Sequence, residues 1–442
     1  MHLFNRVTAV WRHILSVLVI VCVVLAFDGH ASNGDEDLLH SDLGTALEIA
    51  LLVRLWYVEP VKVSDLLAAY MTTDTIEGML ESLGDQYTRY MDHEAYQAYT
   101  EDVTGTYSGI GIHVGLRNGR TTVIAPMPDT PAMRAGLAPG DVILAIDGKS
   151  TENMSLEEAV SLMKGPEATR VVLTIQRGDE PPRDVEIVRA QITVPVVDYR
   201  MIEDGIGYLG LVMFSADTVE QTKRALDDLI SQGAEGIVLD LRWNGGGLFD
   251  QAVQVASMFV DDGPIVYRVG RDGIRNTYLR SPEVPIYDLP VVVLVNEWSA
   301  SSAEIVAGAL KDRNRAYLVG TQTFGKGVVQ GVFPLSNGGA LSLTTDRYLT
   351  AAGHSIHEVG IAPDFVVELP EAPLQETSPQ PVPSNPDQVQ SAEDGTVDTE
   401  ATDGGAAGDG EIENAVVEDT QLIRAVEILR SILAGEELPA AS

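Results

Sequence analysis

The chain has 442 residues, 45% hydrophobic and 21% charged, which fits a globular protein of about three domains and excludes a disordered or collagen-like chain. Its formal net charge of −36 at pH 7 disfavours binding to nucleic acid or anionic lipid, and we interpret that charge as a source of solubility. The single cysteine, Cys22, excludes an intramolecular disulfide and a cysteine-based zinc cluster.

Residues 1–31 have the pattern of a secretory signal. Arg6 and Arg12 precede an apolar run over 14–27, and small residues at Gly29 and Ala31 resemble a cleavage site. This run of 14 residues is short for a membrane span, which needs about 20. We therefore expect an exported, periplasmic protein. The alternative is an uncleaved segment that tethers the chain to the inner membrane.

The region 35–104 is predicted to be a helical cap or dimerisation region. Apolar residues recur there near every 3.6 positions, as at Leu43, Leu47 and Leu51. An aromatic cluster that includes Tyr87 follows, and we interpret it as packing.

The region 105–190 is predicted to be one small domain of short strands and turns with a helix over 155–163. Strands and helices alternate over 191–370, as in the strands at 236–240 and 290–295 and the helix at 303–311. Such alternation predicts a largely parallel sheet.

An acidic, proline-rich segment follows at 371–415, and we predict a disordered linker there. Residues 416–436 read as one amphipathic helix. Because an apolar-faced helix beyond a long linker usually docks on something, it is a candidate assembly element.

The stretch after the buried strand 290–295 contains the candidate nucleophiles. The strand stops at Asn296, and Ser299, Ser301 and Ser302 stand in a small-residue turn before a helix. Free N–H groups and the dipole at a helix N-terminus favour a developing negative charge. The alternative is a serine-rich helix cap without catalytic function.

A candidate base lies between two glycines at Lys326. A lysine acts as a base only when desolvation or a neighbouring cation depresses its pKa. Gln330 follows four residues later, where its amide can hold the lysine or the serine. The alternative is an ordinary surface lysine in a turn.

A glycine-rich loop at 240–247 follows the buried strand 236–240 and can present backbone N–H groups to an oxyanion or a phosphate. No Gly-Lys-Ser/Thr follows it, which disfavours a nucleotide-binding loop. His354 and His357 lie in a loop with Asp364, which we interpret as structural, so neither a Ser-His-Asp triad nor a metal site is predicted.

Three motifs jointly resemble the carboxyl-terminal processing proteases, the tail-specific protease family of bacterial envelopes and chloroplast lumens. They are Asp-Leu-Arg-x-Asn-x-Gly-Gly over 240–247, Asn-x-x-Ser-Ala-Ser-x-x-Glu-Ile over 296–305 and Phe-Gly-Lys-Gly-x-x-Gln over 324–330, and the spacing of 25 between the serine and the lysine agrees with the family. The resemblance implies an α/β, crotonase-like protease core, an inserted α+β PDZ domain, and helical segments at both ends.

The resemblance also implies the catalytic roles. Ser301 would attack the scissile carbonyl, Lys326 would accept and later donate the proton, and Gln330 would orient the lysine. The oxyanion hole would be formed by the N–H group of Gly246 or Gly247 together with that of Ser302. No cofactor or metal is implied.

Two positions depart from the family pattern. Trp298 stands where glycine is usual, which is expected to narrow the entrance to the site. Ser301-Ser302-Ala303 stands where Ser-Ala-Ser is usual, so Ser299 and Ser302 are rival nucleophiles, although the lysine spacing favours Ser301. Asp312, eleven residues after Ser301, is a rival to Gln330 and ranks below it.

The domain at 105–190 resembles a PDZ domain, with the segment 131–141 typical of that fold. The residues at its carboxylate-binding loop are Gly109, Ile110, Gly111 and Ile112. An exposed strand edge at 111–114 can pair with an extended peptide while loop N–H groups hold its terminal carboxylate. The expected partners are protein substrates with exposed, apolar C-termini.

Together these features predict a serine endopeptidase of the cell envelope that processes or degrades envelope proteins near their C-termini. The resemblance also implies a homo-oligomer, a dimer or larger, and leaves room for an adaptor protein. One alternative is a catalytically silent PDZ scaffold or chaperone on the same fold. Another is an acyl-CoA enzyme suggested by fold analogy, which is disfavoured because an exported chain would seldom meet that substrate.

Overall fold

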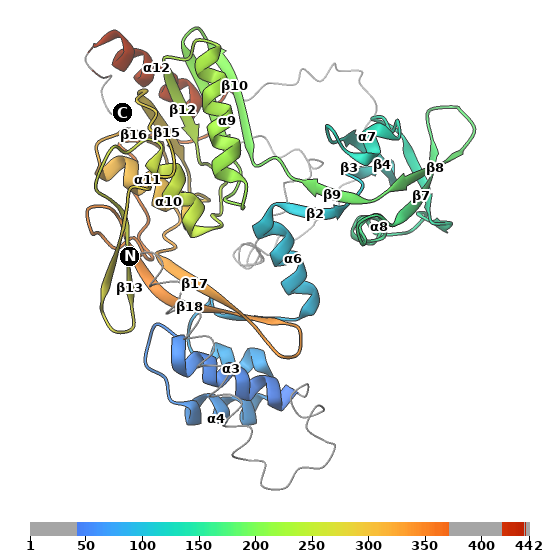
Figure 1. The fold of residues 1–442 in the computed structure, drawn as a ribbon, viewed down its shortest axis with the longest axis horizontal. Coiled ribbons are helices and arrows are strands. Elements are labelled where there is room, and N and C mark those ends of the chain that lie inside the picture. Colours follow the sequence, from blue (N-terminus) through green and yellow to red (C-terminus); the bar gives the residue numbers. More distant parts are fainter. Residues whose placement is uncertain (1–41, 371–417, 437, 439–442) are drawn as a thin grey trace, which may run out of the picture.

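The computed structural model describes residues 42–370, 418–436 and 438. Figure 1 shows a group of N-terminal helices, a middle domain carried on two strands, and a larger core that includes the C-terminal helix. The predicted signal at 1–31 and the acidic segment at 371–415 lie outside the described residues. Within the described ranges, no helix is both long and apolar enough to cross a membrane.

Three helices begin the described chain: α3 (Asp42–Trp56), α4 (Val63–Thr73) and α5 (Ile76–Glu81). One side of α3 is buried against Leu341 and Leu343 of β18 (Ala340–Leu349), a strand of the core. This packing joins the N-terminal helices to the core. The other side leaves Leu43, Leu47 and Leu55 exposed.

The region 35–104 also contains a strand that its helical pattern did not predict. β1 (Arg89–Met91) pairs antiparallel with β18, and α6 (His93–Thr104) follows it. Three residues are too few to show the alternation by which a strand is recognised in sequence.

The middle domain is entered through β2 (Thr106–Gly109) and left through β9 (Ala190–Thr193), which pair antiparallel. Between them lies a sheet of order β3-β4-β5-β7-β8, with β6 beside β5. The strand β3 is therefore an edge strand. The elements of this unit are β3 (Ile112–Arg117), β4 (Arg120–Pro126), α7 (Pro131–Arg134), β5 (Val142–Ile146), β6 (Lys149–Ser150), α8 (Leu156–Met163), β7 (Arg170–Gln176) and β8 (Arg183–Val188).

The core is built on a sheet of order β10-β11-β12-β15-β16-β19. The strands from β11 to β19 are parallel to their neighbours, as the alternating pattern predicted, and only β10 is antiparallel. The elements are β10 (Val197–Glu203), β11 (Ile206–Leu211), α9 (Thr218–Ser231), β12 (Gly236–Asp240), α10 (Phe249–Ser257), β15 (Val291–Val295), α11 (Ser302–Asp312), β16 (Ala316–Gly320) and β19 (Phe365–Val366).

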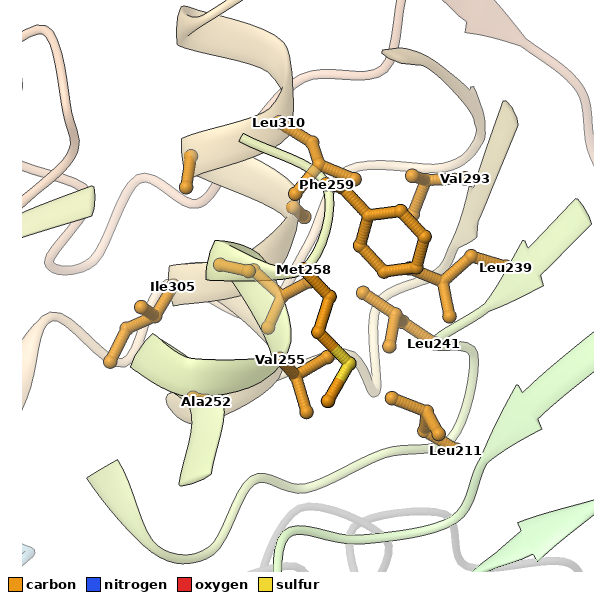
Figure 2. Close-up of a cluster of buried hydrophobic side chains, with 14 of the residues drawn as sticks. Leu211, Leu239, Leu241, Ala252, Val255, Met258, Phe259, Val293, Ile305 and Leu310 are labelled. Atoms are coloured by element: carbon orange, nitrogen blue, oxygen red, sulfur yellow. The ribbon is translucent and has the colours of Figure 1, made fainter. Parts of the chain in front are cut away.

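Both faces of this sheet are buried, which explains its unbroken apolar strands. Leu239 belongs to the cluster on the side of α9, α10 and α11, whereas Val238 belongs to a second cluster on the opposite face. Figure 2 shows Phe259, which follows α10, beside Leu239 and Val293. The carboxyl ends of β12 and β15 are thereby held at fixed positions, and both predicted catalytic loops begin there.

A second sheet positions the loop that contains Lys326. Its order is β1-β18-β13-β14, with β17 paired to β18. Its remaining strands are β13 (Pro264–Gly270), β14 (Arg275–Leu279) and β17 (Val328–Pro334). Because β17 begins two residues after Lys326, the sheet fixes one end of the lysine loop.

The helix predicted at 416–436 is α12 (Thr420–Ala434), and it docks on the core sheet of its own chain (Figure 1). Ala425, Ile428 and Leu429 are fully buried there, in a cluster with Val238 and Val292. A role for this helix in assembly stays a prediction.

The middle domain contains a buried ion pair that makes its stability depend on pH. Asp141 is fully buried and accepts from Arg177 Nε at 2.6 Å and Nη2 at 2.8 Å, and from the Ala138 N–H at 2.9 Å. Burial alone would raise the pKa of Asp141, but the bonds from Arg177 and Ala138 hold it below its usual value.

The stabilisation from ionised Asp141 is therefore present above pH about 4 and lost as pH falls through its lowered pKa. We expect Asp141→Asn to lower the thermal midpoint of the full chain at pH 7 by at least about 4 °C and to weaken the acid dependence. Circular dichroism between pH 3 and 7 measures both. Glu186→Gln, in an exposed pair, is the matched control. Equal behaviour of the two variants would contradict the assignment.

Candidate active site

The predicted nucleophile stands at a sharp strand-to-helix turn. β15 ends at Val295, and α11 begins at Ser302, so Ser301 is the helix N-cap. Its backbone has φ +53° and ψ −112°, a conformation rarely adopted by residues other than glycine. Such strain is characteristic of functional turns. It sets Ser301 directly before the free N–H groups of a helix N-terminus.

The two rival serines are committed to other bonds. Ser299 is fully buried, and its hydroxyl donates to the Leu241 carbonyl at 2.8 Å. The Ser302 hydroxyl donates to the Gly247 carbonyl at 2.9 Å. Ser301 is only partly buried, so it is the most accessible of the three.

One buried carboxylate connects the serine turn to the lysine loop. Glu304 Oε2 accepts from the N–H groups of Ser301 and Lys326, both at 2.9 Å. Its Oε1 accepts from Thr323 Oγ1 at 2.6 Å and from the Gly325 N–H at 2.8 Å. Burial raises the pKa of Glu304, and these four donors oppose that rise. A single side chain thus fixes the backbones that carry both predicted catalytic residues.

The glycines beside Lys326 are needed for close backbone packing. A Cβ on Gly325, which has φ +90°, would lie 2.8 Å from the Gly360 N, and one on Gly327 would lie 2.7 Å from the His357 N. Any larger residue would therefore displace the loop.

The side chain of Lys326 contacts an aromatic ring from the N-terminal region. Its Nζ lies 4.6 Å from the centroid of Tyr87, a buried residue that follows α5. Cation–π attraction and shielding from water both follow from this contact. The sequence around Tyr87 predicts only packing, since nothing local to it indicates a partner so distant in the chain.

The predicted third member, Gln330, bonds to the neighbouring strand β18. Gln330 lies at a β-bulge in β17, and its amide donates to Thr344 Oγ1 at 3.4 Å. Its orienting role therefore stays a prediction. Asp312 lies at the opposite end of α11 from Ser301, where it accepts from the Ala352 N–H at 2.7 Å. That contact supports a structural role.

The glycine loop lies against the serine turn and is held there by hydrogen bonds of Asn244. The Asn244 carbonyl accepts from the Ala300 N–H at 3.0 Å, and its side chain donates to the Leu211 carbonyl at 2.7 Å. A Cβ on Gly246 would lie only 2.9 Å from the Ser301 Cβ. Close approach of the two loops therefore requires glycine at position 246.

The structure corrects one predicted oxyanion donor. The Gly246 N–H already donates to Asn244 Oδ1 at 2.9 Å, so it is not available to a substrate. Within the described ranges, the N–H groups of Gly247 and Ser302 make no hydrogen bond. They are the remaining candidates on the two sides of Ser301.

Trp298, which was expected to narrow the entrance, stacks on Trp243. Their ring centroids are 6.0 Å apart with planes inclined by 18°. Asn296 Oδ1 accepts from the N–H of Trp243 at 3.0 Å and from that of Trp298 at 3.2 Å. The two tryptophans thus form one unit at the rim of the loops, with Trp243 58% exposed.

The histidine loop has no metal-binding geometry. His357 packs its ring 6.1 Å from that of Tyr87, and Asp364 pairs with Lys311. Among the residues that the structure places, no group of three or more histidine, cysteine or acidic side chains is close enough to hold a metal ion.

The four residues assigned to carboxylate binding line a groove in the middle domain, beside Val114, Val160 and Met163. The Ile110 carbonyl accepts from the Ala132 N–H at 2.9 Å, and the Gly111 carbonyl accepts from the Met127 N–H at 3.0 Å. Because C=O and N–H point in opposite directions across a trans peptide, the next two N–H groups, of Gly111 and Ile112, point away from these bonds. The apolar groove thus ends beside two backbone donors.

Comparison with known proteins agrees with this architecture. The profile of peptidase family S41 matches residues 205–367, and a PDZ domain profile matches 122–177. The fold and site thus define a serine peptidase with a PDZ domain. The S41 match covers the core that contains Ser301 and Lys326.

The relatives are more specific. A carboxy-terminal-processing protease of Bartonella bacilliformis is 45% identical over 306 residues, which cover 67% of this chain and 69% of the relative. A carboxyl-terminal-processing protease of Synechocystis is 40% identical, over 70% of this chain and 74% of that one. The solved photosystem II D1 C-terminal processing protease is 32% identical, with a TM-score of 0.48, over 76% of this chain and 94% of that one. The chain belongs to the carboxyl-terminal processing protease family.

The buried carboxylate gives the sharpest test of this geometry. Glu304→Gln replaces one of the two carboxylate oxygens by an NH₂ group. That NH₂ group would face the backbone N–H donors that now bond to the carboxylate, so donor would meet donor. We expect the protein to lose about 2–4 kcal/mol of stability and at least about 100-fold in kcat/KM. Denaturant unfolding and peptide cleavage measure the two effects. Glu297→Gln, an exposed residue near the same turn, should change neither. Wild-type activity in Glu304→Gln would show that the link between the loops is dispensable.

Proposed function

We propose that this chain is a serine endopeptidase of the cell envelope that captures protein C-termini and cleaves near them by a Ser-Lys mechanism. The observation that carries the proposal is Glu304, which holds the backbones of Ser301 and Lys326 through the same oxygen. The names of the curated relatives support the C-terminal preference.

In the proposed reaction, Ser301 Oγ attacks the scissile carbonyl carbon while the neutral amine of Lys326 takes the hydroxyl proton. The N–H groups of Gly247 and Ser302 stabilise the negative oxygen of the tetrahedral intermediate. Collapse of the intermediate breaks the C–N bond, and Lys326 returns the proton to the leaving amine. Water then attacks the acyl-enzyme by the same proton transfers. The Tyr87 ring favours the ammonium form that appears during each attack.

Substrate capture is assigned to the PDZ groove. An extended peptide would pair with the free edge of β3, with its terminal carboxylate at the N–H groups of Gly111 and Ile112. The groove is lined by Val114, Val160 and Met163, which suits an apolar last residue. The site selects chain ends because only a chain end supplies a main-chain carboxylate.

We also place a homo-oligomer contact on α3. Leu43, Leu47 and Leu55 are 39–47% exposed and recur at multiples of four residues, so they share one side of the helix. An exposed leucine stripe of this kind is best covered by the same stripe of a second copy. The signal pattern at 1–31 supports export to the envelope.

The catalytic assignment predicts the outcome of three substitutions. Ser301→Ala and Lys326→Ala should each lower the rate of cleavage of a denatured protein with an apolar tail by at least about 10³-fold. Each substitution removes a group that takes part in the proposed reaction, the attacking hydroxyl or the amine that accepts its proton. Asp312→Asn should stay within about threefold, since that side chain bonds to Ala352. Gel-based turnover with unfolding midpoints measures these effects. Full activity of Ser301→Ala would refute the mechanism, and so would loss only in Asp312→Asn.

The carboxylate assignment predicts a dependence on the peptide end. With the Ser301→Ala variant, an apolar peptide with a free C-terminus should bind at least about tenfold more tightly than its amide. Gly111→Ala should abolish that difference, because its Cβ would lie 2.4 Å from Thr130 Cγ2 at φ +76°. Gly119→Ala has a similar φ of +70° but meets no atom within 4 Å, so it should keep the preference. Fluorescence anisotropy measures each affinity, and equal binding of acid and amide would contradict the assignment.

A further inference from the structure

The N-terminus of α12 contacts the catalytic glycine loop through one arginine. Arg242 Nη1 and Nη2 donate to the two carboxylate oxygens of Asp419 at 2.9 and 2.8 Å. Arg242 Nη2 also donates to Asp240 Oδ2 at 2.7 Å, and Nη1 to Gln421 Oε1 at 3.1 Å. One guanidinium thus joins the end of β12, the glycine loop and the C-terminal helix.

On the core side this contact is removed from water, whereas the Asp419 side chain is 37% exposed. The Arg242 side chain is 9% exposed and that of Asp240 is 8% exposed. Burial would lower the pKa of Arg242, but its bonds to Asp419 and Asp240 raise it, so the guanidinium stays charged. Burial would likewise raise the pKa of Asp419, which the bond from Arg242 holds down. A buried cation that loses one of two carboxylate partners is costly to keep in place.

The position of Arg242 in the chain gives the contact its catalytic consequence. The Arg242 N–H donates to Asp240 Oδ1 at 2.9 Å, and the next N–H, of Trp243, donates to Asn296 in the serine turn. Gly247 follows five residues after Arg242 in the same loop. We therefore expect a displacement of Arg242 to displace the rest of this short, hydrogen-bonded loop, including the N–H group of Gly247, the proposed oxyanion donor.

The place where α12 docks is also fixed at its start. Thr420 Oγ1 donates to the Glu368 carbonyl at 2.8 Å, and Gln421 Nε2 donates to the Val367 carbonyl at 2.7 Å. Residues 367–368 directly follow β19. Residues 367–368 and 420–421 therefore lie side by side, although they are far apart in the sequence.

We propose that α12 is a positioning element of the active site and that Asp419 acts through Arg242 to hold the Gly247 side of the oxyanion hole. The inference rests on the proposed role of Gly247. With the helix docked, Arg242 has both carboxylate partners and the loop is held. When α12 leaves, Arg242 keeps only Asp240, and the loop loses its tie to the opposite face of the sheet. The C-terminal helix is thus required for turnover, although it contains no catalytic residue.

The test is the conservative substitution Asp419→Asn in the full chain. Asparagine caps a helix as well as aspartate does, so the bond from the Leu422 N–H to the cap is kept while the charge facing Arg242 is lost. We expect kcat to fall about tenfold, a fraction of the 10²–10³-fold loss known for removal of an oxyanion donor. KM and peptide binding to the PDZ domain should not change.

The control is Arg430→Gln, which removes another ion pair between α12 and the core sheet, to Glu203 on β10. It should keep wild-type kcat, because this pair, with Arg430 60% exposed, does not involve Arg242 or the glycine loop. A second pair of variants separates the helix from the acidic segment. Replacing 371–417 by a short glycine-serine linker should keep activity, whereas ending the chain at Pro370 should lower kcat at least as much as Asp419→Asn. A synthetic peptide of residues 418–436 should then restore part of the loss.

The outcomes distinguish the two proposals. If Ser301→Ala is inactive while Asp419→Asn and Arg430→Gln turn over equally fast, the positioning role is wrong and the proposed function stands. If Asp419→Asn raises KM with kcat unchanged, Asp419 affects binding and the oxyanion argument fails. If Ser301→Ala retains activity, the proposed function itself fails, whatever Asp419→Asn does.

Discussion

The arrangement of this active site depends on one buried carboxylate that accepts four hydrogen bonds. Glu304 stands one turn into α11, and its two oxygens hold the Ser301 N–H on one side and the loop 323–326 on the other. A buried charge of this kind is stable only when its donors are all in place. The backbones of the serine turn and the lysine loop are therefore tied to one another, and the relative position of the proposed nucleophile and base follows from a requirement of folding.

The glycines around the site are required because the loops that form it pack closely against one another. Gly246 faces Ser301, and Gly325 and Gly327 face the loop 357–360, each at distances that exclude a Cβ. Ser301 has a side chain and yet adopts φ +53°. Its strain is maintained by the bond from its N–H to Glu304 and by Tyr348, which donates to its carbonyl at 3.0 Å. The packed core below the turn supplies the stability that this strain consumes.

The sequence predicts the parts of this site that are local in the chain and misses those that depend on distant contacts. Ser301 and Lys326 stand in short motifs, and the alternation of strands and helices predicted the parallel sheet beneath them. The hydrogen bond that occupies the Gly246 N–H is a matter of side-chain geometry that spacing does not show. Tyr87 and Asp419 reach the site from opposite ends of the described chain, so no pattern within a window could connect them to it. Gln330 stands at a spacing that predicts a role beside the lysine; in the structure it lies at a β-bulge with its amide bonded to Thr344, and its orienting role stays a prediction.

The contacts of Tyr87 with Lys326 and of Asp419 with Arg242 connect the site to distant parts of the fold. The proposed Ser-Lys pair would be hazardous if it were active in a partly folded chain, because nothing would then restrict its substrates. Here Tyr87, from the N-terminal region, covers the lysine, and Asp419, from the last helix, holds the loop beside the serine. Neither contact can form until β1 has paired with β18 and α12 has covered the core sheet. Completion of the site is thus coupled to completion of the fold.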